Sequence, residues 1–262
     1  MTILHALLAI ASGSLVGFSL GLVGGGGSIL AVPLLYYVVG VSDPHVAIGT
    51  SAIAVAVSAA SNLFGHARAG TVKWPCALVF AVSGVIGAEA GAQFGKMVDG
   101  HRLLMLFGVL MVVIGLTMLR PRKSGSNADV QFTRESMPTL LPLLIGIGFL
   151  VGALSGFFGI GGGFLIVPGL IGATAMPMLN AIGSSLVSIT AFGLTTAASY
   201  AVSGLIDWPL AILFIIGGAL GGLFGIRLAR HLSGNKHALT RIFSGIVIIV
   251  GIYVIVRSLM GA

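Results

Sequence analysis

The chain has 262 residues, of which 57% are hydrophobic and only 7% are charged. An average soluble domain carries roughly 25% charged residues, so this composition indicates a polytopic membrane protein. The formal net charge of +7 does not indicate a nucleic-acid partner, because that requires basic residues clustered on a soluble face. The longest polar stretch covers residues 120–137, which is too short for a soluble catalytic or ATP-hydrolysing domain.

Ten hydrophobic runs follow one another along the chain, and the first lacks the basic segment of a cleaved signal peptide. A membrane span needs about 20 apolar residues, so most of the runs qualify, whereas the second and the seventh are short. The runs cover residues 3–23, 24–41, 45–65, 74–95, 102–119, 138–158, 159–174, 180–203, 208–226 and 239–259.

The ten runs are two copies of five. GGGGSILAVP (24–33) aligns with GIGGGFLIVP (159–168), AIGTS (47–51) with AIGSS (181–185), and HARAGTVKWP (66–75) with YAVSGLIDWP (200–209). The offset stays nearly constant, which is typical of a tandem duplication. We therefore predict a first membrane repeat over 1–119, a cytoplasmic linker over 120–137 and a second repeat over 138–262.

The basic residues predict that the two copies are inverted. Equivalent loops differ in charge. The loop with Arg68 and Lys73 in the first copy corresponds to a loop in the second copy that has Asp207 and no basic residue. At the next turn the second copy carries more basic residues than the first. Cytoplasmic loops carry an excess of Lys and Arg, so equivalent loops are expected on opposite sides of the membrane. Five crossings per half satisfy this and place both termini outside. The alternative is four crossings per half, which would make the repeats parallel.

The two short runs are the candidate substrate site. In transporters with inverted repeats, paired short segments interrupted by glycine or proline mark that site. A helix that begins inside the membrane presents unpaired N–H groups and the positive end of its dipole to an anion. The alternative is that the glycines only allow close helix packing. The candidate residues are Gly24, Gly25, Gly26, Gly27 and Ser28, with Gly159, Gly161, Gly162 and Gly163.

These doubled motifs resemble the TauE/SafE sulfite exporter family, which is built from two copies of a small membrane domain. The resemblance covers nearly the whole chain. It implies transport of sulfite, thiosulfate or an organosulfonate across the cytoplasmic (inner) membrane, usually outward. No Lys-Ser/Thr follows the glycines, so they do not form a P-loop, and no strand precedes them as in a dinucleotide site.

Small hydroxyl residues accompany the glycines and would donate hydrogen bonds to an anion without trapping it. The alternative for these hydroxyls is hydrogen bonding between helices. Asn62 is a further candidate donor. The set comprises Gly49, Thr50 and Ser51 in the first copy and Gly183, Ser184 and Ser185 in the second.

Three ionisable residues break the symmetry of the copies. Glu89 is the only carboxylate in the middle of a predicted span, where an ionisable group is a functional hypothesis by default. It is our candidate for proton coupling, against the alternative of a neutral packing partner. His66 and Arg68 are candidates for drawing anions toward the inner mouth, and Arg68 alternatively serves as a plain membrane anchor.

The sequence thus predicts an all-α, multi-pass secondary transporter for a small sulfur-containing anion, working by alternating access with the bilayer and protons as its other partners. No cofactor, metal or catalytic residue is expected: the single Cys76 forms no zinc motif. Three alternatives remain. A passive anion channel would use the same glycines, a membrane scaffold would lack a midplane cavity, and an enzyme would need a nucleophile with a positioned base.

Overall fold

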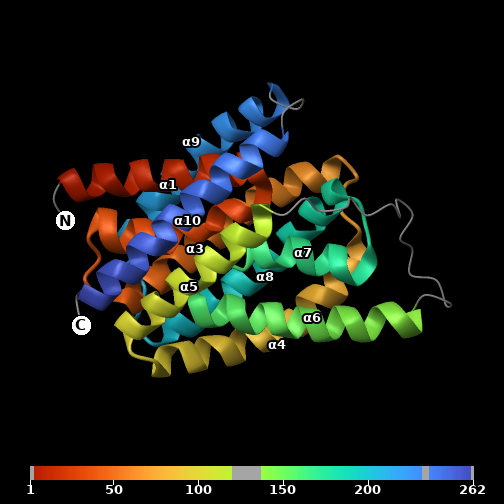
Figure 1. The fold of residues 1–262 in the computed structure, drawn as a ribbon, viewed down its shortest axis with the longest axis horizontal. Coiled ribbons are helices and arrows are strands. Elements are labelled where there is room, and N and C mark those ends of the chain that lie inside the picture. The colour runs from red at the N-terminus through yellow and green to blue at the C-terminus, as the bar shows by residue number, and fades with distance from the viewer. Residues whose placement is uncertain (1–2, 120–136, 232–235, 261–262) are drawn as a thin grey trace.

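The computed structural model describes residues 3–119, 137–231 and 236–260, and within these ranges it consists of helices and short connections without strands (Figure 1). The predicted linker at 120–137 lies almost entirely outside the described residues. The elements are α1 (Ile3–Val23), η1 (Gly24–Leu30), α2 (Ala31–Pro33), η2 (Leu34–Val39), α3 (Pro44–Arg68), α4 (Trp74–Met97), α5 (Gly100–Leu119), α6 (Met137–Phe158), α7 (Gly163–Thr174), α8 (Met178–Val202), α9 (Trp208–His231) and α10 (Lys236–Met260).

Eight of the described helices are long and apolar enough to cross a membrane, and two shorter apolar segments accompany them. This confirms the prediction of a polytopic all-α protein with two short segments. Large apolar side chains are exposed on every long helix, as on a surface that faces lipid. Examples are Leu7, Phe64, Ile86, Val113, Leu150, Leu194, Phe224 and Ile249.

The halves are inverted, because equivalent helices run in opposite directions. A Cβ on Gly108 of α5 would lie 2.9 Å from the carbonyl oxygen of Gly251 in α10, whereas one on Gly115 would lie 3.2 Å from that of Ser244. Residue numbers therefore rise along one helix as they fall along the other. In Figure 1, α1 begins at the end where both termini lie, and α6 begins at the opposite end.

The two halves exchange helices rather than pack as separate bodies. The most extensive helix contacts join α1 to α9 and α4 to α6. Because α1 is equivalent to α6 and α9 is equivalent to α4, these are two copies of one helix pair. Both pairs depend on glycine: a Cβ on Gly17 would overlap the carbonyl oxygen of Gly218, and one on Gly152 would overlap that of Gly84. Small residues let helix backbones approach closely in membranes, where burial of apolar surface gives little drive.

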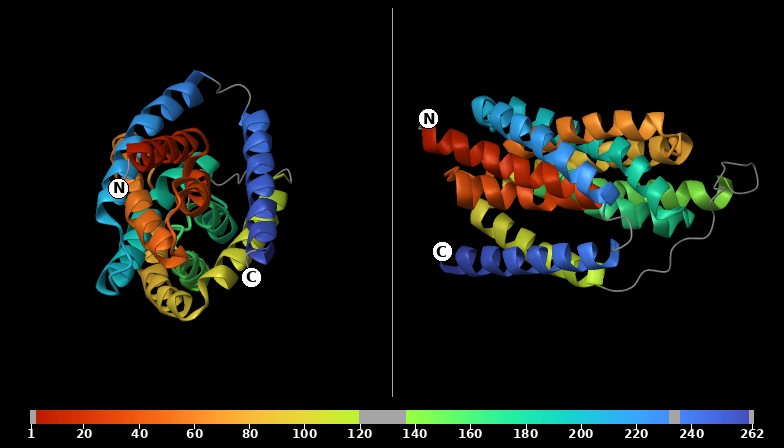
Figure 2. Two further views of the ribbon diagram at one scale, coloured as in Figure 1. Left: turned by 90° about the vertical axis from the view of Figure 1, so that its left-hand side faces the viewer. Right: turned by 90° about the horizontal axis from the view of Figure 1, so that it is seen from above.

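Three groups of helices result from this exchange. α1, α3 and α9 form one bundle, and α4, α6 and α8 form its counterpart. α3 and α8 join the two bundles at the centre. The third group is the α5–α10 pair, which lies along one side of the molecule (Figure 2).

The short segments lie in the core at the centre of this arrangement. η1, α2 and η2 replace one continuous helix in the first half, and α7 is preceded by a turn at 159–162 in the second. The helix of α7 continues through Pro168, so this segment is broken at its glycines and not at its proline. Neighbouring helices can satisfy the backbone groups that proline frees inside a membrane protein.

Candidate functional site

The turn before α7 depends on its glycines. Gly159, Gly161 and Gly162 all have φ near +65°, a conformation that glycine adopts without steric penalty. The first N–H groups of this segment with a helical partner are those of Leu165 and Ile166, which both donate to the carbonyl oxygen of Gly162. The N–H groups of residues 161–164 have no hydrogen-bond partner among the described residues.

Residues from α3, α6 and α8 surround this turn. Ser51 of α3 donates from Oγ to the carbonyl oxygen of Ile48 at 2.8 Å and to that of Gly159 at 3.3 Å. The Cβ position of Gly161 lies 3.0 Å from Val55 of α3 and 3.4 Å from Ile189 of α8. Three core helices therefore hold the unpaired N–H groups in place.

The glycine-rich segment of the first half meets this turn's helix. Gly24 to Gly27 and Ser28 lie in η1, which packs against α1, α7 and α8. Ser28 is fully buried. The structure thus brings together the two glycine-rich segments that the sequence singled out, one from each inverted half.

The AIGTS and AIGSS motifs each accept a hydrogen bond from a turn of the opposite half. The N–H of Asp207 donates to Thr50 Oγ1 at 3.1 Å, and the N–H of Lys73 donates to Ser184 Oγ at 2.9 Å. Asp207 and Lys73 are themselves equivalent positions. The glycines at 49 and 183 leave room for these turns, since a Cβ on either would meet a backbone carbonyl oxygen of the opposite half.

Several fully buried hydroxyls in the described part of the chain have no hydrogen-bond partner. Ser185 Oγ donates to Ile182 O at 2.8 Å, as Ser51 does to Ile48. By contrast, four of the described hydroxyl groups and one ring nitrogen are buried without a hydrogen bond. They are Ser155 Oγ, Ser188 Oγ, Thr196 Oγ1, Tyr200 Oη and His45 Nδ1. None of these five residues is predicted from the sequence as a binding residue.

Comparing the two copies would have found Ser155. It lies four residues before the glycine run, where the aligned first copy has Leu20. A polar residue that appears in one copy beside a shared motif is the signal that sequence reasoning overlooked.

Glu89 lies on the exposed surface of α4. It accepts hydrogen bonds from Gln93 Nε2 at 2.6 Å and from Ser199 Oγ of α8 at 3.4 Å. Lys96 extends the cluster, donating from Nζ to the hydroxyls of Ser199 and Ser203 at 3.1 Å. Glu89 therefore belongs to a polar network that connects α4 to α8.

Asn62, His66 and Arg68 are remote from the turns. Helix geometry places His66 about 22 Å along α3 from Ser51, which contacts the turn. His66 Nδ1 lies 2.9 Å from Thr71 Oγ1, and the Arg68 guanidinium lies 4.1 Å from the Phe64 ring centroid. All three residues lie in the last turns of α3.

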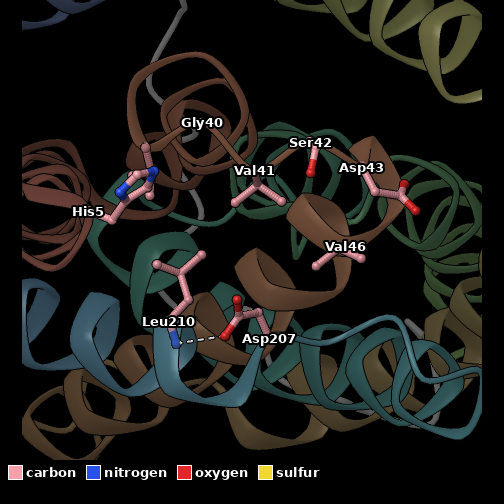
Figure 3. Close-up of a pocket in the computed structure, with 9 residues that line it drawn as sticks. His5, Gly40, Val41, Ser42, Asp43, Val46, Asp207 and Leu210 are labelled. Atoms are coloured by element: carbon pink, nitrogen blue, oxygen red, sulfur yellow. Dashed lines mark hydrogen bonds between the residues drawn. The ribbon is translucent and has the colours of Figure 1, made fainter. Parts of the chain in front are cut away.

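A cavity of about 250 Å³ opens at the end of the molecule where the chain begins (Figure 3). Asp43 and Asp207 line it, and each carboxylate caps a helix: Asp43 accepts from the N–H of His45 at 2.8 Å and Asp207 from that of Leu210 at 3.0 Å. Two carboxylates repel anions, so this cavity is not the anion site. No cluster that could hold a metal ion occurs in the described part of the chain.

Two inverted halves, each with a broken segment in the core, define a polytopic membrane transporter of the inverted-repeat class. The family model described as Sulfite exporter TauE/SafE matches residues 9–254. The chain belongs to the TauE/SafE sulfite exporter family, and it is a membrane transporter. This family is one of transporters rather than enzymes.

Relatives with similar sequences are named as transporters. A probable membrane transporter protein of Xylella fastidiosa (strain Temecula1) is 55% identical over 98% of both chains. One from Haemophilus influenzae is 30% identical over 76% of this chain and 74% of its own. YunE of Bacillus subtilis, also a probable membrane transporter protein, is 27% identical over 86% of this chain and 89% of its own. No solved structure matches the chain.

Proposed function

We propose that this protein is a secondary transporter that exports a small sulfur-containing anion by alternating access. The observation that carries the proposal is the meeting of η1 and α7 in the core, with unpaired N–H groups at the start of α7. The family description, sulfite exporter, supports the substrate class and the outward direction. Sulfite, thiosulfate and organosulfonates share the sulfur-bound oxygens that such N–H groups would bind.

The chemistry of the turns suits reversible binding. Glycine N–H groups and the partial positive charge of a helix N-terminus stabilise an anion without a full countercharge. Gly24 to Ser28 and Gly159 to Gly163 supply this backbone, and the hydroxyls of Ser51 and Ser185 lie on the adjoining helices. An inside-negative potential would favour exit by about 2.3 kcal/mol per charge per 100 mV.

Coupling to protons is assigned to Glu89. Its carboxylate connects α4 to Ser199 of α8, so neutralising it would weaken a contact between two helices of the core. Protonation of Glu89 would then loosen the packing of α4 against α8 during the transport cycle, and deprotonation would restore it.

The positive-inside rule supports the orientation in the membrane. Ten of the thirteen Lys and Arg residues then lie on the cytoplasmic side of the inner membrane, including those of the linker at 120–137. The repeats at 1–119 and 138–262 would place both termini outside. Arg68, at the end of α3, would lie at the inner mouth.

The test is flux from proteoliposomes loaded in turn with sulfite, thiosulfate, sulfoacetate and chloride, with and without a pH gradient. We expect saturable flux of a sulfur anion that responds to the gradient, and loss of that response in Glu89→Gln. Flux that is unchanged in Glu89→Gln would contradict the coupling role alone. Absence of flux for every sulfur anion would contradict the proposed function.

A further inference from the structure

Ser155 presents an unpaired hydroxyl to the glycine turn. Its side chain, on the last turns of α6, is 0% exposed, and its Oγ has no hydrogen-bond partner. The hydroxyl faces the turn, because Oγ lies 2.9 Å from the position that a Cβ on Gly162 would take. Since Gly162 has no side chain, nothing separates this hydroxyl from the backbone before α7.

A buried, unpaired hydroxyl is unfavourable in the folded protein. Ser155 lies beside four unpaired N–H groups, those of residues 161–164. The start of the 12-residue helix α7 adds a partial positive charge at the same place. All of these groups can donate hydrogen bonds, so their common partner is an anion.

The first half offers a weaker version of the same arrangement. There the Cβ position of Gly27 lies 2.8 Å from the Cβ of Ser19 on α1. The hydroxyl of Ser19, however, donates to the carbonyl oxygen of Leu15 at 2.8 Å. Of these two hydroxyls, the unpaired one is that of Ser155 in the second half.

We propose that Ser155 Oγ and the N–H groups at the start of α7 bind the –SO₃ head of the transported anion. This subsite makes the second half the principal binding half, and it rests on the proposed function above. The Ser155 hydroxyl donates to one oxygen of the head while the backbone N–H groups serve the others. A halide also accepts several hydrogen bonds at once, but it cannot give each donor an acceptor atom of its own, as the three oxygens of an –SO₃ head do.

The test compares wild type with Ser155→Ala, purified in detergent, by apparent unfolding temperature in a titration with sulfite, thiosulfate or sulfoacetate. Chloride at equal ionic strength is the reference. We expect sulfur anions to stabilise wild type, and Ser155→Ala to need about tenfold more anion or beyond, because a hydrogen bond to a charged group is lost. Without anion, Ser155→Ala should be as stable as wild type or more so, since an unpaired buried hydroxyl has been removed.

Thr190→Val is the matched control. Thr190 lies on α8, and its hydroxyl is already paired with the carbonyl oxygen of Leu186 at 2.8 Å. The half-saturating anion concentration of this variant should equal that of wild type.

Each other outcome is decisive. Equal half-saturation in Ser155→Ala and wild type would overturn the subsite and leave the proposed function intact. Clear loss of stability in unliganded Ser155→Ala would assign the hydroxyl a structural role and overturn the subsite as well. Stabilisation of wild type without flux in proteoliposomes would contradict the proposed function alone. No stabilisation of wild type by any of the three sulfur anions would overturn both.

Discussion

Buried hydroxyl groups in this core are of two kinds: some accept a hydrogen bond from the opposite half, and others have no hydrogen-bond partner. Thr50 and Ser184 each accept a hydrogen bond from a backbone N–H of the opposite half, so their oxygens tie the halves together. Ser155 has no such partner and borders the glycine turn. A hydroxyl that is hydrogen-bonded to the opposite half stabilises the fold, whereas the unpaired hydroxyl of Ser155 can bind a ligand.

Replacing either pairing hydroxyl should destabilise the protein. In Thr50→Val the N–H of Asp207 loses its acceptor, and in Ser184→Ala the same happens to Lys73. An unpaired, partly buried N–H is unfavourable by about 1–3 kcal/mol, so both variants should unfold several degrees below wild type in detergent. The two effects should be similar, because the positions are equivalent.

Unchanged unfolding temperatures together with loss of flux would contradict this assignment and return both hydroxyls to direct anion binding. Thr190→Val again serves as the control, because it removes a hydroxyl that bonds only within its own helix.

At the scale of residues, the sequence identified the doubled motifs but not what their side chains contact. The doubled glycines and hydroxyls were recognisable because they occur at the same place in both copies. Glu89 was recognisable as a carboxylate in an apolar run, but hydropathy does not report the direction of a side chain, and Glu89 lies on the exposed surface of α4. Partners such as Asp207 for Thr50 are 157 residues away in the chain and follow only from the tertiary fold.

Helix pairing by glycine is the main feature at the scale of elements. α6 packs on α4 and α1 packs on α9 through glycines that face backbone carbonyl oxygens. These contacts have no room for a methyl group. Helices in a membrane gain little from burying apolar surface, so such close backbone contact supplies much of their association.

A pair of substitutions within α6 tests this. In Gly152→Ala the new methyl would overlap the carbonyl oxygen of Gly84, so the α4–α6 pair must separate and the unfolding temperature should fall markedly. In Gly146→Ala, on the same helix, the methyl meets nothing within 4 Å. That variant should be neutral or slightly stabilised, because alanine favours helix over glycine by up to about 1 kcal/mol. Equal stability of the two variants would contradict the role of glycine in this pair.

The lengths and order of the elements could be predicted from hydropathy, and all ten predicted runs correspond to helical segments. The glycine runs also identified where the short segments break. Hydropathy could not predict that α1 pairs with α9, because a glycine that faces a helix and one that faces lipid look alike in sequence. Hydropathy also does not show whether a proline ends a helix, and α7 continues through Pro168.

At the scale of the whole molecule, the two halves are joined by helix pairs that each take one helix from either half. This limits which groups of helices can move as rigid units. Because α4 is bound to α6 and α1 to α9, one repeat cannot rock as a unit against the other without breaking both pairs. Alternating access by rigid bodies would therefore have to move groups such as α1–α9 and α4–α6, each of which contains helices from both halves. The α3–α8 contact joins these groups, close to the glycine turn.

Inversion predicts that equivalent turns lie on opposite sides of the membrane. In a Cys76→Ala background, cysteine at Ala69 should react with a membrane-impermeant reagent only from the cytoplasmic side. Cysteine at Val202, which is 92% exposed and lies at the equivalent turn, should react only from outside. Labelling of both positions from one side would contradict the inverted arrangement.

The central claim is that a sulfur oxyanion is carried by alternating access, and exchange across a vesicle membrane tests it most directly. Uptake of labelled sulfite into proteoliposomes would be compared for vesicles filled with unlabelled sulfite and vesicles filled with chloride. We expect saturable uptake that is accelerated by sulfite inside, because a loaded site returns faster than an empty one. Uptake that rises linearly with sulfite concentration and ignores the anion inside would contradict it and indicate a channel.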